Sequence, residues 1–484
     1  MGRHMILKPI IIVHRYVGVV LGVIMTLWCL SGFVMMYQPF PDTTPEERQA
    51  GLSPLDLSRA QADLPLAADA TAMSFRVEML NGAPVLRMTG GDGPKTVDLT
   101  TGAELTPLSE AAVRRAAETF ARNSGLKGQI TELGTLTVDQ WSVQGAKRWQ
   151  PLWRAVFNDP AQTWLYVNGR TGEIVQDVTG HERFWNWLGA IPHWLYPTIL
   201  RENGPLWTQV VIWSSAIGCF LVITGMVIGI ARLRGRSGAW WPYKRPMWML
   251  HHVFGTFAGL LVLTWTFSGL MTMSPWGLLE SESPVSRRDL QGEMTWADMR
   301  TAIATVKADE TANLDSIRSA PLLGQPHVYA QQSDGAEIRF GLHGRAPFSR
   351  AELDASLAAR GGLLATGRID VLADEDDYYY GHKRVVELPV YRITLADPEQ
   401  TRIYIGQQSG ELRQLADGTT QRYRWALNAM HNLDLAFMRS RPVWDIVTLI
   451  LLALVTVACA TGAWLSFTRI GTDVSRLREM LKRK

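Results

Sequence analysis

Four of the ten histidines in this 484-residue chain stand in matched sequence surroundings. His14 and His251 each begin the pattern H-x3-G-x3-G-x5-W-x2-S-G, and every matching pair of positions differs by 237. His193 and His431 both lie shortly before a long apolar segment, and each is followed eight residues later by an arginine. Neutral imidazole is a common ligand of transition metals. Two repeat-matched pairs therefore indicate metal chemistry, whereas a single histidine at such a position is usually only a polar residue.

Four apolar segments would position these histidines. A helix needs about 20 residues to cross the hydrocarbon core of a bilayer. The segments that are long enough cover residues 16–41, 204–231, 246–279 and 446–468. We therefore expect a membrane α-helical protein with four transmembrane helices.

The positions of Lys and Arg predict the orientation of these segments. The connector after the second segment and the C-terminal tail are rich in both, and Arg3 and Lys8 precede the first segment. Both termini should then face the cytoplasm, with the loops 42–180 and 280–425 on the opposite side. In a Gram-negative cell this is an inner-membrane protein with two large periplasmic loops.

The rest of the chain extends the repeat. Further matches are Thr224-Gly225 with Thr461-Gly462 in the second and fourth segments, and residues 151–160 with 389–398 in the loops. Each half contains two spans, so two parallel tandem repeats should be related by a pseudo-twofold axis along the membrane normal. That symmetry lets His14 face His251 and His193 face His431.

Opposed histidines from the helices of a bundle can hold haem iron. The three cysteines, Cys29, Cys219 and Cys459, lie in apolar segments, and the sequence has no C-x-x-C-H motif. A disulfide framework is therefore excluded, and a haem would be held by ligation and packing rather than covalently. The sequence predicts two b-type haems with bis-His ligation, one on each histidine pair.

The neighbours of the histidines have alternative interpretations. Gly18 and Gly255, with Gly22 and Gly259, leave room for a flat macrocycle or serve as close helix contacts. The candidate ligands of haem propionates are Arg201 and Arg439 at one pair, and Arg15, Lys244 and Arg245 at the other. Arginines at the ends of spans are also simple topology signals. His252 rivals His251 as the ligand, and the glycine spacing favours His251.

Other residues carry weaker signals. His181, His327, His343 and His382 have no repeat partners and are expected in soluble loops. The net charge of +3 is too small to argue for nucleic-acid binding. No catalytic residue beyond the haem ligands is indicated.

The repeated motifs resemble those of the PepSY-associated transmembrane proteins, and in particular the di-haem siderophore-iron reductases of the ferrioxamine type. The resemblance rests on H-R-Y-x-G near the start, the two Arg…Asp-Pro…Tyr…Gly-Glu loop segments, and the histidines before the even-numbered spans. It implies a periplasmic PepSY module of α+β structure between the two spans of each half, and an oxidoreductase that reduces ferric siderophores, releasing Fe²⁺. His14, His251, His193 and His431 are then the implied haem ligands.

The resemblance also completes the expected domain order. The parts are a first span (10–40), a PepSY-like domain (41–181), an outer interfacial helix with the second span (182–232), a basic cytoplasmic loop (233–245), the third span (246–277), a second PepSY-like domain (278–425), an outer helix with the fourth span (426–469) and a cytoplasmic tail (470–484).

Several features bear on partners. The cytoplasmic segments are too short for a flavin or nicotinamide domain, so the electron donor should be quinol or a separate reductase. Loop aromatics such as Tyr378, Tyr379 and Tyr380 could suit a siderophore. Two alternatives stay open: a non-redox regulatory, scaffolding or protease-inhibitory PepSY protein, and a haem reductase for copper or a sulfur oxyanion.

Overall fold

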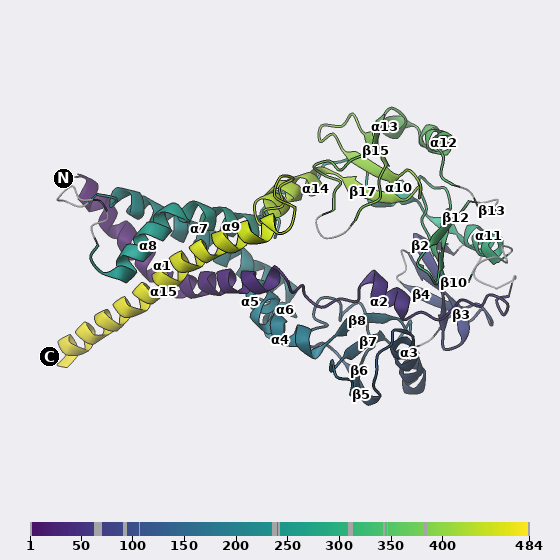
Figure 1. Cartoon of the computed structure of the whole chain (residues 1–484), viewed down its shortest axis with the longest axis horizontal. Coiled ribbons are helices and arrows are strands. Elements are labelled where there is room, and N and C mark those ends of the chain that lie inside the picture. The colour runs from purple at the N-terminus through teal and green to yellow at the C-terminus, as the bar shows by residue number, and fades with distance from the viewer. Residues whose placement is uncertain are drawn as a thin grey trace. The chain divides into compact units, whose positions relative to one another are not determined.

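The computed structural model describes residues 2–61, 70–90, 94–105, 107–234, 240, 243–307, 313–341, 344–345, 347–381 and 385–482 (Figure 1). The chain divides into two compact units. The helical unit comprises Met1–Phe40, Phe184–Glu280 and Arg422–Lys484. The sheet unit comprises Pro41–Arg183 and Ser281–Gln421.

Three continuous helices of the helical unit are long and apolar enough to cross a membrane: α1 (Gly2–Met35), α7 (Gly204–Ala231) and α15 (Val443–Lys482). The start of α7 shows why the sequence folds this way. The Asn203 side chain accepts a hydrogen bond from the Leu206 amide at 3.1 Å, and a proline occupies the first turn. α1 lies against both α7 and α15.

The apolar segment after residue 245 is not one helix. α8 (Pro246–Phe257) and α9 (Gly259–Met271) meet at a bend of 61°. In the last turn of α8, the Thr256 hydroxyl donates to the carbonyl of His252 at 2.6 Å. α1 has Val19 at the matching position and carries no such bond there.

The predicted fold class, a membrane α-helical protein with four transmembrane helices in two parallel repeats, is therefore wrong. Among the described residues, three continuous helices and one bent pair meet the length and composition of a span. Four β-sheets occupy the sheet unit, so the chain is a mixed α and β protein. The apolar composition of the sequence indicated where these segments lie, but no residue pattern predicted the bend.

Short helices complete the helical unit and connect it to the strands. They are α4 (Gly180–Leu188), α5 (Ala190–His193), α6 (Thr198–Arg201), the 3₁₀ turn η1 (Pro275–Gly277), α14 (Gly418–Tyr423) and the π-helical turn η2 (Arg424–Ala429). Two of them end at or just before the histidines predicted as ligands: α5 ends at His193, and η2 ends two residues before His431.

The sheet unit is built on a seven-stranded antiparallel sheet in the order β13-β12-β11-β10-β2-β3-β4. Its strands are β2 (Ser74–Leu80), β3 (Ala83–Thr89), β4 (Lys95–Asp98), β10 (Leu314–Ser319), β11 (Val328–Gln332), β12 (Glu337–Gly341) and β13 (Gly344–Arg345). β2 and β10 pair directly, with Val77 opposite Ile317. The two long loops of the sequence therefore contribute strands to one sheet.

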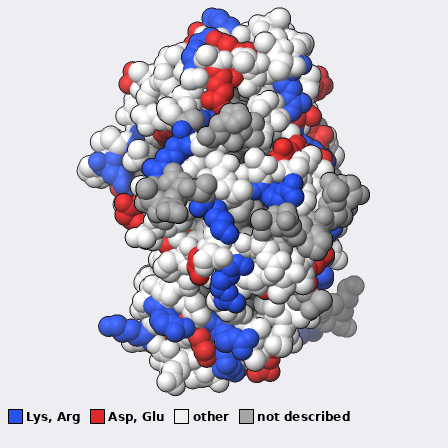
Figure 2. All heavy atoms as spheres, turned by 90° about the vertical axis from the view of Figure 1, so that its right-hand side faces the viewer, with Lys and Arg blue, Asp and Glu red and all other residues white. Residues whose placement is uncertain are grey.

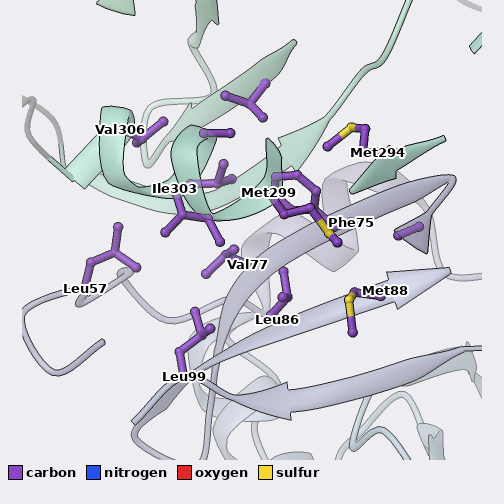
Figure 3. Close-up of a cluster of buried hydrophobic side chains, with 14 of the residues drawn as sticks. Leu57, Phe75, Val77, Leu86, Met88, Leu99, Met294, Met299, Ile303 and Val306 are labelled. Atoms are coloured by element: carbon purple, nitrogen blue, oxygen red, sulfur yellow. The ribbon is translucent and has the colours of Figure 1, made fainter. Parts of the chain in front are cut away.

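An apolar core covers one face of this sheet. Phe75, Val77 and Leu86 from β2 and β3 face Met299 and Ile303 from α11 (Trp296–Lys307) (Figure 3). Val77 and Met299 are fully buried. The alternation of apolar and polar residues along β2 predicts this one-sided burial.

Two four-stranded sheets flank the core with the same strand order. One contains β5 (Ile130–Leu136), β6 (Leu152–Phe157), β7 (Trp164–Asn168) and β8 (Ile174–Val178); the other contains β14 (Arg368–Leu372), β15 (Val390–Thr394), β16 (Arg402–Gly406) and β17 (Leu412–Ala416). Tyr166 and Tyr404, which match in the repeat, donate to Asp139 and Asp376 at 2.7 and 2.8 Å.

The remaining elements of the sheet unit are short strands and helices. They are α2 (Pro45–Ala50), α3 (Glu110–Asn123), α10 (Arg287–Gln291), α12 (Arg350–Arg360), α13 (Gly362–Ala365) and the paired strands β1 (Thr71–Ala72) and β9 (Met294–Thr295). On the face drawn in Figure 2, basic and acidic side chains are interspersed, in keeping with the small net charge.

Candidate functional site: two facing histidine pairs

The structure brings the four repeat-matched histidines together in two pairs within the helical unit. The ring centroids of His14 on α1 and His251 on α8 lie 6.3 Å apart. Those of His193 at the end of α5 and His431 after η2 lie 6.0 Å apart. Each pair joins one histidine from each half of the sequence, as the repeat predicted.

A backbone carbonyl orients each ring through Nδ1. In the first pair, His14 bonds the Leu221 carbonyl at 3.0 Å and His251 bonds the Ala458 carbonyl at 3.1 Å. These two acceptors lie on α7 and α15, at matching positions of the repeat. The neighbouring hydroxyls of Thr224 and Thr461 lie 3.3 and 3.5 Å from the same nitrogens.

The second pair is oriented in the same manner. His193 bonds the Trp28 carbonyl at 3.1 Å, and His431 bonds the Trp265 carbonyl at 3.2 Å. Each Nδ1 also lies 3.0 Å from a serine hydroxyl. Those serines are Ser31 for His193 and Ser268 for His431.

These bonds determine which ring nitrogen carries the proton. A carbonyl oxygen only accepts, so each Nδ1 must donate its hydrogen. In a neutral imidazole the lone pair then belongs to Nε2, which is the nitrogen left to bind a metal. Burial, and then the adjacent His431, lower the pKa of His193 to about 4. The ring is therefore neutral at physiological pH.

Two glycines hold the first pair by close packing. An added Cβ at Gly225 would lie 2.6 Å from Cε1 of His14, and one at Gly462 would lie 2.7 Å from Cε1 of His251. Only glycine therefore lets α7 and α15 approach these rings so closely. The sequence interpretation assigned these glycines no role, although their recurrence as Thr-Gly pairs was the available signal.

Two tryptophans anchor the chain beside the second pair. The Trp207 indole donates to the carbonyl of Trp194 at 2.9 Å, and Trp444 donates to that of Asn432 at 2.8 Å. Each acceptor directly follows a paired histidine in the sequence. Trp207 and Trp444 lie 237 residues apart, as His14 and His251 do, but their contact with the histidine segments appears only in the folded chain.

A cavity lies beside the His14–His251 pair. Gly18, Gly22, Gly255 and Gly259 all line it. Gly22 lies against the backbone of Ala463 and Gly259 against Met226, where an added Cβ would approach to 3.3 and 2.9 Å. These two serve helix contact as well as space, whereas a Cβ on Gly255 would meet only the His251 ring, at 3.8 Å.

Basic residues border this cavity. Arg15 lines it, and so do Arg232, which directly follows α7, and Arg469, which lies within α15. The sequence interpretation treated the last two as topology signals. Lys244 and Arg245 do not line the cavity, whereas their neighbour Tyr243 does.

The two arginines near the second pair differ in their partners. The Arg439 guanidinium forms a buried ion pair with Asp434 at 2.7 Å. Arg201 instead stacks on Tyr196 and Trp207, with its Cζ 5.1 and 4.6 Å from their ring centroids. The buried Nε of Arg201 has no hydrogen-bond partner among the described residues.

The rival histidine is turned toward another partner. His252 is buried, and its Nε2 bonds the Gly229 carbonyl at 2.9 Å. Because that carbonyl needs a donor, Nε2 of His252 carries a proton there. His251, and not His252, is the residue whose ring faces His14.

Two further histidines belong to the sheet unit. His181 lies in α4, and His327 is buried in the sheet unit beside Arg339, 3.0 Å away. Burial, and then Arg339, lower the pKa of His327 to about 4. His343 and His382 lie outside the described residues. The described part of the chain has no cluster of three or more His, Cys, Asp or Glu side chains that could hold a metal ion.

Apolar helices long enough to cross a bilayer, with two facing imidazole pairs among them, define a membrane protein. The sequence profile of the PepSY-associated TM region matches residues 11–469. The chain therefore belongs to the PepSY-associated transmembrane family. No curated protein gives a match.

Proposed function

We propose that this chain is an oxidoreductase of the bacterial inner membrane that holds two b-type haems, one on each histidine pair. The separation of the rings is the observation that carries the proposal. Two metal–nitrogen bonds of about 2 Å each, with half of each ring, would separate two imidazole centroids by about 6 Å. The observed separations are 6.3 and 6.0 Å.

The surroundings of the first pair also fit a haem. A cavity lined largely by glycine and apolar residues adjoins the rings, and Arg15, Arg232 and Arg469 border it. A flat apolar macrocycle needs such space, and its propionates need cations. At the second pair, Arg201 offers an Nε donor for the same purpose.

A bound haem supplies an iron that accepts and releases one electron at a time. The residues of the chain hold it and set its position. Each carbonyl bond to Nδ1 fixes the tautomer and raises the basicity of the ligand nitrogen. α1 rises about 21 Å from His14 to Trp28, whose carbonyl orients His193. This spacing would divide a hydrocarbon core of about 30 Å into shorter steps.

For the reaction we propose transfer of electrons from quinol or a separate cytoplasmic reductase to a periplasmic ferric siderophore, which then releases Fe²⁺. Both termini would face the cytoplasm. The support for this acceptor is the resemblance of the sequence motifs to siderophore-iron reductases. The His193–His431 pair would be the electron exit.

Haem content tests the first part of the proposal. The purified full-length protein should contain about two haems per chain, with bis-His spectra in both redox states. A protein that expresses and folds normally in haem-replete cells, yet shows no Soret band, would refute it and favour a regulatory or scaffolding role.

Reoxidation tests the acceptor. Dithionite-reduced protein, freed of excess reductant, should be rapidly reoxidised by a ferric hydroxamate siderophore in stopped-flow experiments. Cu²⁺ and tetrathionate provide the comparison. Reoxidation by either of these, with none by the siderophore, would exclude ferric siderophore reduction. The proposal that the chain holds two haems would not be affected.

A further inference from the structure

The two histidine pairs differ in the angle between their ring planes. The planes of His14 and His251 meet at 32°, whereas those of His193 and His431 meet at 74°. The ring centroids of the two pairs are nearly equally far apart, at 6.3 and 6.0 Å, so the pairs differ in rotation rather than in distance. The rings of the first pair are therefore closer to parallel, and those of the second pair are crossed.

Backbone carbonyls hold the rings of the first pair at their angle. His14 and His251 bond the carbonyls of Leu221 and Ala458 through Nδ1, at 3.0 and 3.1 Å. A turn of either ring about its Cβ–Cγ bond would move Nδ1 away from that oxygen. Because both carbonyls belong to the long helices α7 and α15, they cannot follow the ring. The helices thus set the angle between these two planes.

Serine hydroxyls add a second restraint at the crossed pair. Ser31 and Ser268 each place the hydroxyl oxygen 3.0 Å from Nδ1 of the neighbouring histidine. Each hydroxyl donates its hydrogen, at 3.0 Å, to the same carbonyl that the histidine bonds, that of Trp28 or Trp265. Since the hydrogen is used there, a lone pair of the hydroxyl is left to accept from Nδ1. Two acceptors therefore share each N–H and restrict the rotation of the ring.

The threonines beside the first pair supply a weaker restraint. The hydroxyls of Thr224 and Thr461 lie 3.3 and 3.5 Å from Nδ1 of His14 and His251. These distances are at the upper limit of a hydrogen bond. The serine hydroxyls, with their shorter contacts, therefore distinguish the crossed pair.

The angle between ligand rings changes the electronic structure of a bound haem iron. When two imidazoles bind one iron through Nε2, each interacts through its π system with the iron d orbital that its plane selects. Parallel rings select the same orbital and separate two d orbitals in energy, whereas crossed rings select one each and leave the two nearly equal. In ferric iron, separated orbitals give a rhombic EPR signal with all its g values resolved, and nearly equal orbitals give a strongly anisotropic signal. Ligand orientation is one of the means by which a protein tunes a haem.

We propose that the chain holds its two haems with differently oriented ligand rings, and that Ser31 and Ser268 are positioning residues of the crossed site. The inference rests on the proposed haem binding. The first pair should give the rhombic signal, because its rings are closer to parallel, and the crossed pair should give the strongly anisotropic signal. Because separated orbitals stabilise ferric iron, crossed rings also favour the ferrous state at the pair proposed as the electron exit.

Low-temperature EPR of the air-oxidised full-length protein tests the ring orientation. The wild type should show one rhombic and one strongly anisotropic low-spin signal. His251→Ala removes a ligand of the first pair, so the rhombic signal should be lost and the anisotropic signal kept, and His193→Ala should do the reverse. Two signals of the same kind in the wild type, or a rhombic low-spin signal in His251→Ala, would overturn the proposal. A protein without a Soret band would refute haem binding itself, so the two failures are distinguishable.

The double variant Ser31→Ala/Ser268→Ala tests the positioning residues. Each Nδ1 then keeps only its carbonyl, so the rings turn more freely. The anisotropic signal should broaden or shift, while the rhombic signal stays as it is. Ser214→Ala, which removes a hydroxyl bonded to the Val211 carbonyl in α7, is the matched control and should leave both signals unchanged.

The haem-to-protein ratio of the same samples shows whether the crossed site is still filled. Ser268→Ala alone replaces the double variant if that variant loses the haem. An anisotropic signal identical to that of the wild type, in a serine variant that keeps both haems, would contradict the role of the serines.

Discussion

The His14–His251 pair and the His193–His431 pair share one way of orienting a ring and differ in how the ring is kept in place. In both, a helix carbonyl accepts from Nδ1. At the first pair, glycines of the neighbouring helices press against the imidazoles. At the second pair, serine hydroxyls lie 3.0 Å from Nδ1.

This difference follows from where the histidines lie. His14 lies on α1 and His251 on α8, so the His14 ring must fit against α7 and the His251 ring against α15. Only a missing Cβ permits these approaches. His193 is the last residue of the short helix α5, and His431 lies two residues after η2. Serine hydroxyls lie beside these two rings. The first pair should therefore be sensitive to added volume, and the second to lost hydrogen bonds.

The largest expected effect separates His251 from its neighbour. His251→Ala should remove one of two haems, because a single remaining imidazole cannot supply bis-His ligation. His252→Ala should retain both, since His252 bonds the Gly229 carbonyl instead. Haem-to-protein ratio and reduced-minus-oxidised spectra measure this. Loss of a haem in His252→Ala, but not in His251→Ala, would show that the facing ring has been misassigned.

Added volume should break the first pair alone. Gly225→Ala places a Cβ 2.6 Å from the His14 ring, closer than real contacts allow, so the ring or the helix must shift. We expect the loss of most of the haem at this pair and full retention at the other. Gly471→Ala in α15 is the control, because its Cβ would meet nothing within 4 Å. Equal haem content in the two variants would contradict the packing role.

Loss of a hydroxyl should weaken the second pair slightly. Ser31→Ala removes one contact to Nδ1 of His193 but leaves the Trp28 carbonyl in place. The expected cost is about 1 kcal/mol, or roughly fivefold faster transfer of this haem to apomyoglobin. Ser214→Ala, which removes a bond to the Val211 carbonyl in α7, is the control. A change at the first pair instead would contradict the assignment.

The candidate site was more predictable than the fold. His14 and His251, with their glycines and serines, are separated by one constant offset. Their pairing could therefore be predicted on the single assumption that the two halves fold alike. The bend between α8 and α9 was missed because the repeat predicts that the first and third apolar segments form equal helices. The roles of Gly225 and Gly462 were missed because a glycine in an apolar segment can serve helix packing or leave space for another group. Only the structure shows that each of these two lies against a histidine ring.

The amino-acid sequence by itself determined the apolar segments, the internal repeat and the four histidines, because these are properties of residue type and spacing. Only the tertiary structure decided how the residues meet. It pairs β2 with β10, so the two loops share a sheet, and it turns His252 toward Gly229. It also leaves Tyr329 buried without a partner. Each of these features depends on contacts between residues far apart in the chain, and local sequence patterns do not predict such contacts.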